Sequence, residues 1–112
     1  MRPTRFYSKQ QERAVAKATK GKVTANSGAT AFSKGDVRTK SFLLECKTCT
    51  KEQKSFTLHK DWFDKNEEEA FAMNKRYSAL AFNFGDGKNY YVISESLFQT
   101  LLEYLEGEQD NG

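Results

Sequence analysis

Two carboxylates and an amine could meet on one face of a short β-hairpin. Asp36 opens one strand-like run, and Glu45-Cys46-Lys47 lies in the next. Glu45 and Lys47 are two residues apart, so their side chains point to the same side of a strand. Paired carboxylates supply oxygen ligands for Mg²⁺, and a neighbouring lysine places a point charge near a phosphate. The pattern therefore indicates divalent-metal chemistry on phosphate esters.

The hairpin brings these groups together if it turns at Thr39-Lys40. That turn pairs Asp36 with Leu43 and leaves Asp36 and Glu45 on a diagonal of about 7–8 Å between backbones. Alternation then gives the hairpin two faces. One is apolar and is expected to belong to the core: Val37, Phe42, Leu44 and Cys46. The other carries the chemistry: Asp36, Arg38, Ser41, Leu43, Glu45 and Lys47.

Two helices flank this hairpin in the sequence. Ser8 and Gln11 form a capping-box pattern, which predicts a helix from about Lys9 to Lys20 that carries Glu12. A second helix is predicted from about Lys60 to Arg76, and its Glu67-Glu68-Glu69 run is typical of a solvated face.

The remaining segments predict further strands and a last helix. Short runs favour strands at 22–24, 36–38, 41–48, 78–84 and 89–93. Ser94 is expected to cap an amphipathic helix that Gly107 ends. This order indicates one α/β domain over residues 1–112, with a mixed central β-sheet flanked by helices.

Composition and charge narrow the function classes. The chain has 112 residues, a net charge of +3 and 38% hydrophobic residues, and it contains no run long enough for a membrane span. We therefore expect a cytoplasmic protein, or one in the host cytoplasm if it is phage-encoded. The first 22 residues carry one acid, Glu12, among many bases, which fits binding to a polyanion such as DNA. The bases are Arg2, Arg5, Lys9, Arg13, Lys17, Lys20 and Lys22.

The spacing from Asp36 to Glu45-Cys46-Lys47 resembles the signature of the PD-(D/E)XK nucleases, with Glu12 as the additional acid. Within that superfamily the chain looks most like the Holliday-junction resolvases of archaeal and phage type. The resemblance extends over about residues 11–84 in element order, and it implies a restriction-endonuclease-like nuclease core. Gly35 stands in place of the signature proline, and Cys46 in place of a larger apolar residue.

This resemblance implies a role for each residue of the motif. Asp36, Glu45 and the Cys46 carbonyl would hold Mg²⁺, for which Mn²⁺ is expected to substitute, and Glu12 would support that ion or a second one. Lys47 would orient the attacking water or stabilise the phosphate. The substrate would be a four-way DNA junction, which a homodimer cuts twice, with the second and third helices as candidate dimer surfaces. Candidate phosphate contacts are Arg13, Lys22, Ser27, Gly28, Ser33 and Lys34.

Several other interpretations remain open at this level. The same core could belong to a nickase, a flap nuclease or a restriction-type enzyme, or to a DNA-binding protein in which the acids and Lys47 form a surface ion-pair cluster. Cys46 and Cys49 have a CxxC spacing, yet strand alternation puts their sulfurs on opposite faces, which favours a buried, apolar role for Cys46. His59 is expected to cap a helix or to lie on the surface.

Overall fold

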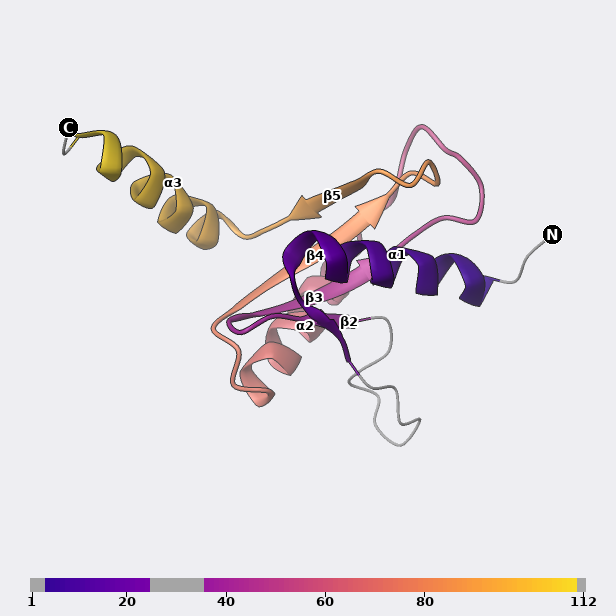
Figure 1. Cartoon of the computed structure of the whole chain (residues 1–112), viewed down its shortest axis with the longest axis horizontal. Coiled ribbons are helices and arrows are strands. Elements are labelled where there is room, and N and C mark those ends of the chain that lie inside the picture. Colours follow the sequence, from indigo (N-terminus) through magenta and orange to yellow (C-terminus); the bar gives the residue numbers. More distant parts are fainter. Residues whose placement is uncertain (1–3, 25–35, 111–112) are drawn as a thin grey trace.

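The computed structural model describes residues 4–24 and 36–110. Five strands form one sheet in the order β1-β2-β3-β4-β5, and three helices accompany it (Figure 1). The helices are α1 (Thr4–Thr19), α2 (Lys60–Ala72) and α3 (Glu95–Asp110). The strands are β1 (Lys22–Val23), β2 (Asp36–Arg38), β3 (Phe42–Lys47), β4 (Tyr77–Asn83) and β5 (Asn89–Val92).

The sheet is mixed, as the sequence predicted. β1, β2 and β3 are successive antiparallel neighbours, and β4 and β5 form a second antiparallel pair. β3 and β4 are parallel, and α2 makes the crossover between them. Parallel neighbours need such a crossover because the chain must return to the starting edge of the sheet. The prediction of a single α/β domain with a mixed sheet and helices is confirmed.

The face of the sheet under α1 is the apolar core. Its fully or nearly fully buried members come from α1, β2, β3 and β4: Val15, Val37, Leu44, Ala79 and Ala81. Phe42 and Cys46 pack against this cluster while partly buried. The predicted apolar face of the first hairpin is therefore correct.

The opposite face of the sheet is covered by α2, so it is also buried (Figure 1). Leu43 and Leu80 are completely buried there, with Ala70 of α2. Asn66 ties the helix to both parallel strands, since its Nδ2 donates to the carbonyl oxygens of Leu43 at 3.4 Å and Ala79 at 3.1 Å. Leu43, which the alternation places on the polar face, thus belongs to a second apolar layer.

The turn of the first hairpin lies one residue later than predicted, so the strand pairing differs from the predicted register. Asp36 pairs directly with Glu45, and Arg38 pairs with Leu43. The reason lies in Thr39, whose N–H donates to the Phe42 carbonyl at 3.0 Å and whose hydroxyl accepts the Phe42 N–H at 3.0 Å. The turn is therefore Lys40-Ser41 rather than Thr39-Lys40. The shift leaves each residue on its predicted face, because the pairing moves by an even number of positions.

Three helix boundaries differ from the prediction. α1 begins at Thr4, so Ser8 lies inside the helix and is not its cap. α2 ends at Ala72 because Asn74, with φ of 62°, leaves the helical conformation. α3 continues through Gly107 to Asp110, although its start is as predicted: the Leu97 N–H donates to Ser94 Oγ at 3.1 Å.

In these two described ranges, none of the helices combines the length and apolar character needed to cross a membrane.

Candidate active site

Asp36 and Glu45 are direct partners across β2 and β3, so their side chains leave the sheet on the same face. Asp36 is 1% exposed and Glu45 is 9% exposed. Thr24, which directly follows β1, fixes the backbone of Asp36. The Asp36 carbonyl accepts the N–H of Thr24 at 3.0 Å and the Thr24 hydroxyl at 3.2 Å. The structure thus brings together the two carboxylates that the motif predicted, closer in register than the predicted diagonal.

Lys47 joins this pair from the same strand. Its Nζ lies 3.7 Å from Glu45 Oε2 and 4.5 Å from the centre of the Trp62 ring on α2. A carboxylate on one side and an aromatic face on the other leave the lysine side chain few conformations. The predicted amine therefore stands beside the carboxylates, while Trp62 was not predicted as its support.

Glu69 of α2 adds a third buried carboxyl group. It is 2% exposed, and its side chain hydrogen-bonds that of Asp36. The prediction that Glu67-Glu68-Glu69 is solvated is therefore wrong for Glu69. The helical period carries the missed signal: Asn66, Glu69 and Ala70 share one face of α2, and all three are buried.

Glu12 lies on the edge of this cluster. It is half-buried on α1, and its charge raises the pKa of both Asp36 and Cys46. Burial in turn raises the pKa of Glu12 itself. We refer to Glu12, Asp36, Glu45 and Glu69 as the acidic cluster.

The electrostatics of the acidic cluster disfavour four free negative charges. Burial raises the pKa of Asp36 to about 8, and the neighbouring charges of Glu45, Glu69 and Glu12 act in the same direction. Burial also raises the pKa of Glu45, against which the charge of Lys47 works. Carboxylates forced together in a poorly solvated site need a proton or a cation to share.

One carboxylate oxygen of the acidic cluster accepts no hydrogen bond from the described residues. Among the described residues, Asp36 Oδ1 is one of a few buried side-chain atoms without a hydrogen-bond partner. A buried carboxylate oxygen without a partner is costly unless an ion or a water binds it. The donor set suits Mg²⁺, which prefers carboxylate and carbonyl oxygens.

The described part of the chain contains no group of three or more histidine, cysteine, aspartate or glutamate side chains placed to hold one metal ion. The expected ligand set does not require this, because it contains two carboxylates, from Asp36 and Glu45, and a backbone carbonyl from Cys46. Glu12 and Glu69 accordingly stand as supporting groups rather than as part of a closed four-carboxylate cage.

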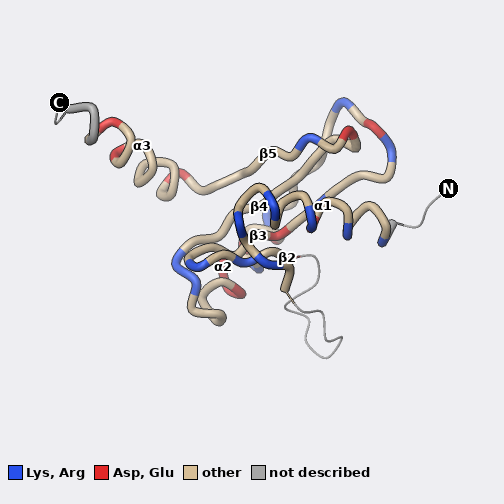
Figure 2. The backbone as a smooth tube through the Cα atoms, in the orientation of Figure 1, with Lys and Arg blue, Asp and Glu red and all other residues tan. Residues whose placement is uncertain are grey.

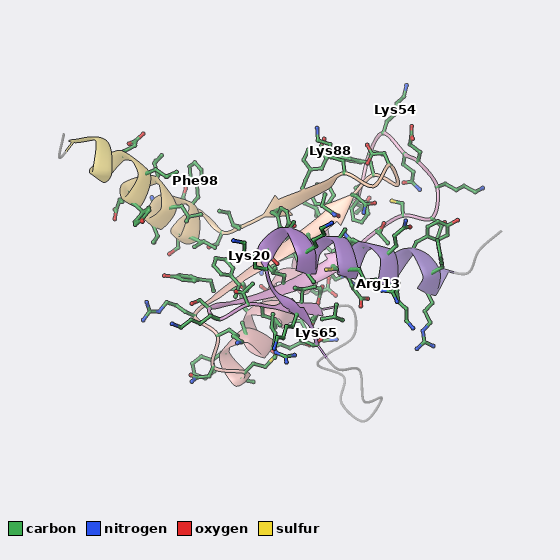
Figure 3. All side chains as sticks on the ribbon, in the orientation of Figure 1. Arg13, Lys20, Lys54, Lys65, Lys88 and Phe98 are labelled. Carbon is green, nitrogen blue, oxygen red and sulfur yellow. The ribbon has the colours of Figure 1, made fainter. Side chains whose placement is uncertain are left out.

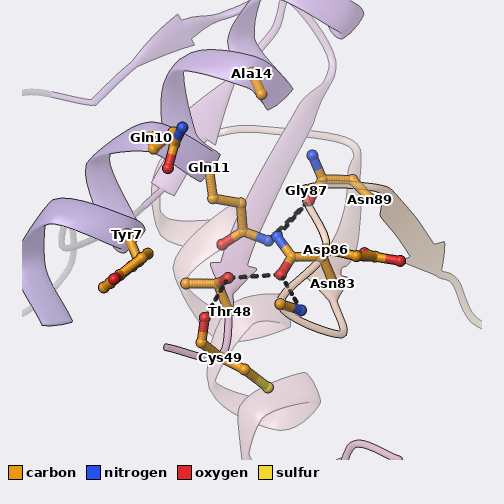
Figure 4. Close-up of a pocket in the computed structure, with 11 residues that line it drawn as sticks. Tyr7, Gln10, Gln11, Ala14, Thr48, Cys49, Asn83, Asp86, Gly87 and Asn89 are labelled. Carbon is orange, nitrogen blue, oxygen red and sulfur yellow. Dashed lines mark hydrogen bonds between the residues drawn. The ribbon is translucent and has the colours of Figure 1, made fainter. Parts of the chain in front are cut away.

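Gln11 fixes α1 beside the cluster. Its Nε2 donates to the carbonyl oxygens of Lys47 at 2.8 Å and Ala81 at 3.2 Å. It also donates to Asn89 Oδ1 at 3.1 Å (Figure 4). These contacts pin the helix one residue before Glu12, at the ends of β3 and β4. A polar pocket of about 350 Å³ adjoins this network, with Tyr7 and Thr48 on its walls.

The predicted phosphate contacts are only partly placed. Arg13 on α1 and Lys22 on β1 are exposed (Figure 3 labels Arg13). Ser27, Gly28, Ser33 and Lys34 lie outside the described residues. Figure 2 shows that basic positions recur along α1, in keeping with the basic N-terminal segment of the sequence.

A row of aromatic rings begins at Trp62, which packs against Lys47. Trp62 packs near Phe56, with ring centres 6.2 Å apart, and Phe56 near Phe82 at 5.3 Å. Phe82 then contacts Phe84 and Tyr90. Phe82 and Phe84 therefore pack against neighbouring aromatic rings. His59 precedes α2 but makes no side-chain capping bond, and its ring lies 4.6 Å from that of Trp62.

The two cysteines lie in different surroundings. Cys46 packs against the core cluster, where burial raises the pKa of its thiol, and Cys49 lines the polar pocket beside Gln11. Both thiols are free. A buried thiol of raised pKa is a poor nucleophile and a poor zinc ligand, so this arrangement favours the apolar role for Cys46.

Neither a protein-family model, nor a curated protein, nor a solved structure matches this chain at a significant level.

Proposed function

We propose that this chain is a Mg²⁺-dependent DNA endonuclease that hydrolyses phosphodiester bonds in branched DNA, and that it acts on four-way junctions as a homodimer in the cytoplasm. The observation that carries the proposal is the pairing of Asp36 with Glu45, beside Lys47, in a buried cluster where one Asp36 oxygen has no partner. The motif's resemblance to Holliday-junction resolvases suggests the substrate.

The arrangement of the elements supports this proposal. The resemblance to the PD-(D/E)XK nucleases runs over residues 11–84, and in that range the chain forms α1, three antiparallel strands, α2 and the parallel strand β4. The signature residues lie on β2 and β3, in the middle of that order. A chance Glu-x-Lys on a surface strand would instead leave its charges solvated and of little energetic consequence.

The chemistry divides among the residues as follows. Asp36, Glu45 and the Cys46 carbonyl are the groups to hold Mg²⁺, with Glu12 and Glu69 in support. When bound, the ion polarises the phosphate and makes water a better nucleophile. Lys47, held between Glu45 and Trp62, directs its positive charge at the phosphate, where negative charge develops during in-line displacement.

Exposed bases on the α1 side complete the substrate contacts. Arg13 and Lys22 would bind backbone phosphates, which positions DNA without reading its sequence. One chain carries one such site, whereas resolution of a four-way junction needs two symmetric cuts. A twofold dimer supplies both.

Cleavage of an end-labelled four-way junction, compared with a linear duplex of the same arm sequence, tests the proposal. We expect paired nicks in the junction with Mg²⁺ or Mn²⁺, none with EDTA, and none with Glu45→Ala. The matched control is Glu68→Ala, which removes an exposed acid from α2 and should cleave like wild type. Equal cleavage of both DNAs would favour a general nuclease, and intact DNA in Mg²⁺ would favour a binding protein.

A further inference from the structure

α3 carries an apolar stripe that its own chain does not cover. Leu97 in the first turn is buried, but Phe98 is 54% exposed and Leu105 is 59% exposed, and Leu101 and Leu102 lie exposed between them. Figure 1 shows α3 leading away from the sheet, and it packs closely on none of the other described helices or strands. A helix of this length gains most of its stability from packing, so the stripe calls for a partner surface.

The same chain has an uncovered apolar hollow of about 380 Å³. It lies on the α1 face of the sheet, with Leu44 and Ala79 of the core among its walls. No residue of the acidic cluster lines this hollow, and the Asp36–Glu45 pair lies on the opposite face of the sheet, so the hollow is a separate feature. Its lining is mostly apolar: Thr19, Thr39, Phe42, Leu44, Ala79, Tyr91 and Ile93.

The charges around the two surfaces are opposite. α3 has acidic residues, Glu95, Glu103 and Glu106, and no lysine or arginine. Lys20 and Lys40 are exposed and directly follow Thr19 and Thr39 of the hollow. Figure 2 shows the acidic positions of α3 and the basic positions at the end of α1. Figure 3 labels Phe98 on α3 and Lys20 directly after α1. An acidic helix with an apolar stripe therefore complements an apolar hollow that is adjoined by two exposed lysines.

The start of α3 directs the helix away from its own hollow. Ile93 lines the hollow, and the next residue, Ser94, accepts the Leu97 N–H on its hydroxyl and the Phe98 N–H on its carbonyl. These two bonds fix the first turn immediately after β5. No described residue of α3 lines the hollow of its own molecule.

We propose that α3 of one copy of this chain packs in the hollow of a second copy, and that the second copy returns its own α3 in the same way. Such an exchange is isologous and closes as a twofold dimer. The role of this dimer rests on the proposed function, which needs two nuclease sites. The two surfaces that meet contain no residue of the acidic cluster.

Disulfide trapping between two differently tagged copies tests this exchange. One copy carries Leu101→Cys on α3, and the other carries Tyr91→Cys at the hollow. We expect a mixed disulfide that joins the two tags, and none in mixtures where either copy lacks its new cysteine. A disulfide between two Leu101→Cys copies without the mixed product would show helix-to-helix pairing, and no intermolecular product would show a monomer; either result overturns the proposal.

Charge substitutions in α3 give a second readout. Leu101→Glu with Leu105→Glu should weaken dimerisation at least tenfold by sedimentation equilibrium. Gln99→Glu adds a charge to an exposed position of the same helix off the stripe and should leave the dimer unchanged. Equal dissociation constants for all three proteins would contradict the proposal.

The dimer test is separable from the test of the nuclease. The Leu101→Cys and Tyr91→Cys copies should form the mixed disulfide equally well when Glu45→Ala is added to both, because Glu45 lies outside both surfaces. The α3 double variant should still bind Mn²⁺ in each monomer. A mixed disulfide without cleavage would therefore reject the proposed function alone, and a dimer that cleaves the junction but forms no mixed disulfide would reject the exchange alone.

Discussion

The carboxyl group of Glu69 on α2 is buried against that of Asp36 at the start of β2, and the two side chains are hydrogen-bonded. Asp36 and Glu69 are far apart in the sequence, so the contact depends on the crossover that packs α2 on β3 and β4. Two buried acids in contact require a shared proton or a cation, which makes the metal-free protein sensitive to pH.

Without metal, the protein should lose stability as the pH rises. The pKa of Asp36 goes from its usual 3.8 to about 8, mainly through burial. The folded state therefore binds a proton that the unfolded state has released, and this contribution to stability is complete below about pH 4 and lost by about pH 8. Urea unfolding in EDTA from pH 5 to pH 9 measures the trend.

Asp36→Asn is the control for this pH dependence, because the amide does not titrate. It should flatten most of the decline, and Mg²⁺ at pH 8 should stabilise wild type but not the variant, since a ligand of the folded state raises stability. Stability that rises from pH 5 to pH 8 in wild type would contradict the account.

Glu69→Gln should lower the pKa of Asp36, because it removes one of the charges that raises it. The carboxyl ¹³C shift of Asp36, followed by NMR against pH, reports this change. The same variant should weaken Mn²⁺ binding by about 10–100-fold, as losses of groups that support a ligand do. Glu68→Gln on the exposed side of α2 should do neither, and identical results for both variants would remove Glu69 from the site.

Lys47→Ala should slow single-turnover cleavage by about 100–1000-fold, the usual cost of one charge-stabilising donor. Mn²⁺ binding should persist, because Lys47 is not expected to be a ligand. An unchanged rate would exclude Lys47 from the chemistry. Lys60→Ala is a suitable control, since its salt bridge with Asp64 is exposed at the start of α2.

Trp62→Ala should slow cleavage by about 2–5-fold, in line with loss of an exposed cation–π contact. Trp62→Phe retains an aromatic face under Lys47 and should recover most of the rate. Equal rates for the two variants would show that the ring does not position the lysine.

Arg13→Ala with Lys22→Ala should weaken DNA binding and reduce its salt dependence. Each lost phosphate contact lowers the slope of log K against log salt by about 0.9 on duplex DNA. Fluorescence anisotropy at several salt concentrations measures the slope, with Lys54→Ala, in the loop before α2, as a comparison. An unchanged slope in the double variant would place DNA elsewhere.

The sequence predicted the core of the site because local rules govern it. Strand alternation places Glu45 and Lys47 on one face of the hairpin. Asp36 lies on that same face with either the predicted or the observed turn, because both registers preserve the faces. Glu69 was missed because its burial depends on where α2 packs, and an acidic run alone indicates solvent. Asn66 escaped notice for the same reason: its partners are backbone carbonyls of strands distant in sequence.

The boundaries of the elements were harder to predict than their order. Thr39 has the hydroxyl that sets the turn, but a two-residue loop could equally have started one position earlier. Phe71 of α2 is 86% exposed, while the polar Asn66 and Glu69 of the same helix take buried positions. Polar residues on the buried stripe of a helix break the usual pattern, and such exceptions tend to mark functional sites.

Titration of Mn²⁺ into the purified protein, with free Mn²⁺ followed by electron paramagnetic resonance, tests the central claim most directly. Wild type should bind Mn²⁺, Mg²⁺ should displace it, and Asp36→Asn and Glu45→Gln should each abolish binding while Glu68→Gln does not. Binding of equal strength in wild type and in both acidic-cluster variants, or no binding in wild type, would contradict the assignment of Asp36 and Glu45 as metal ligands.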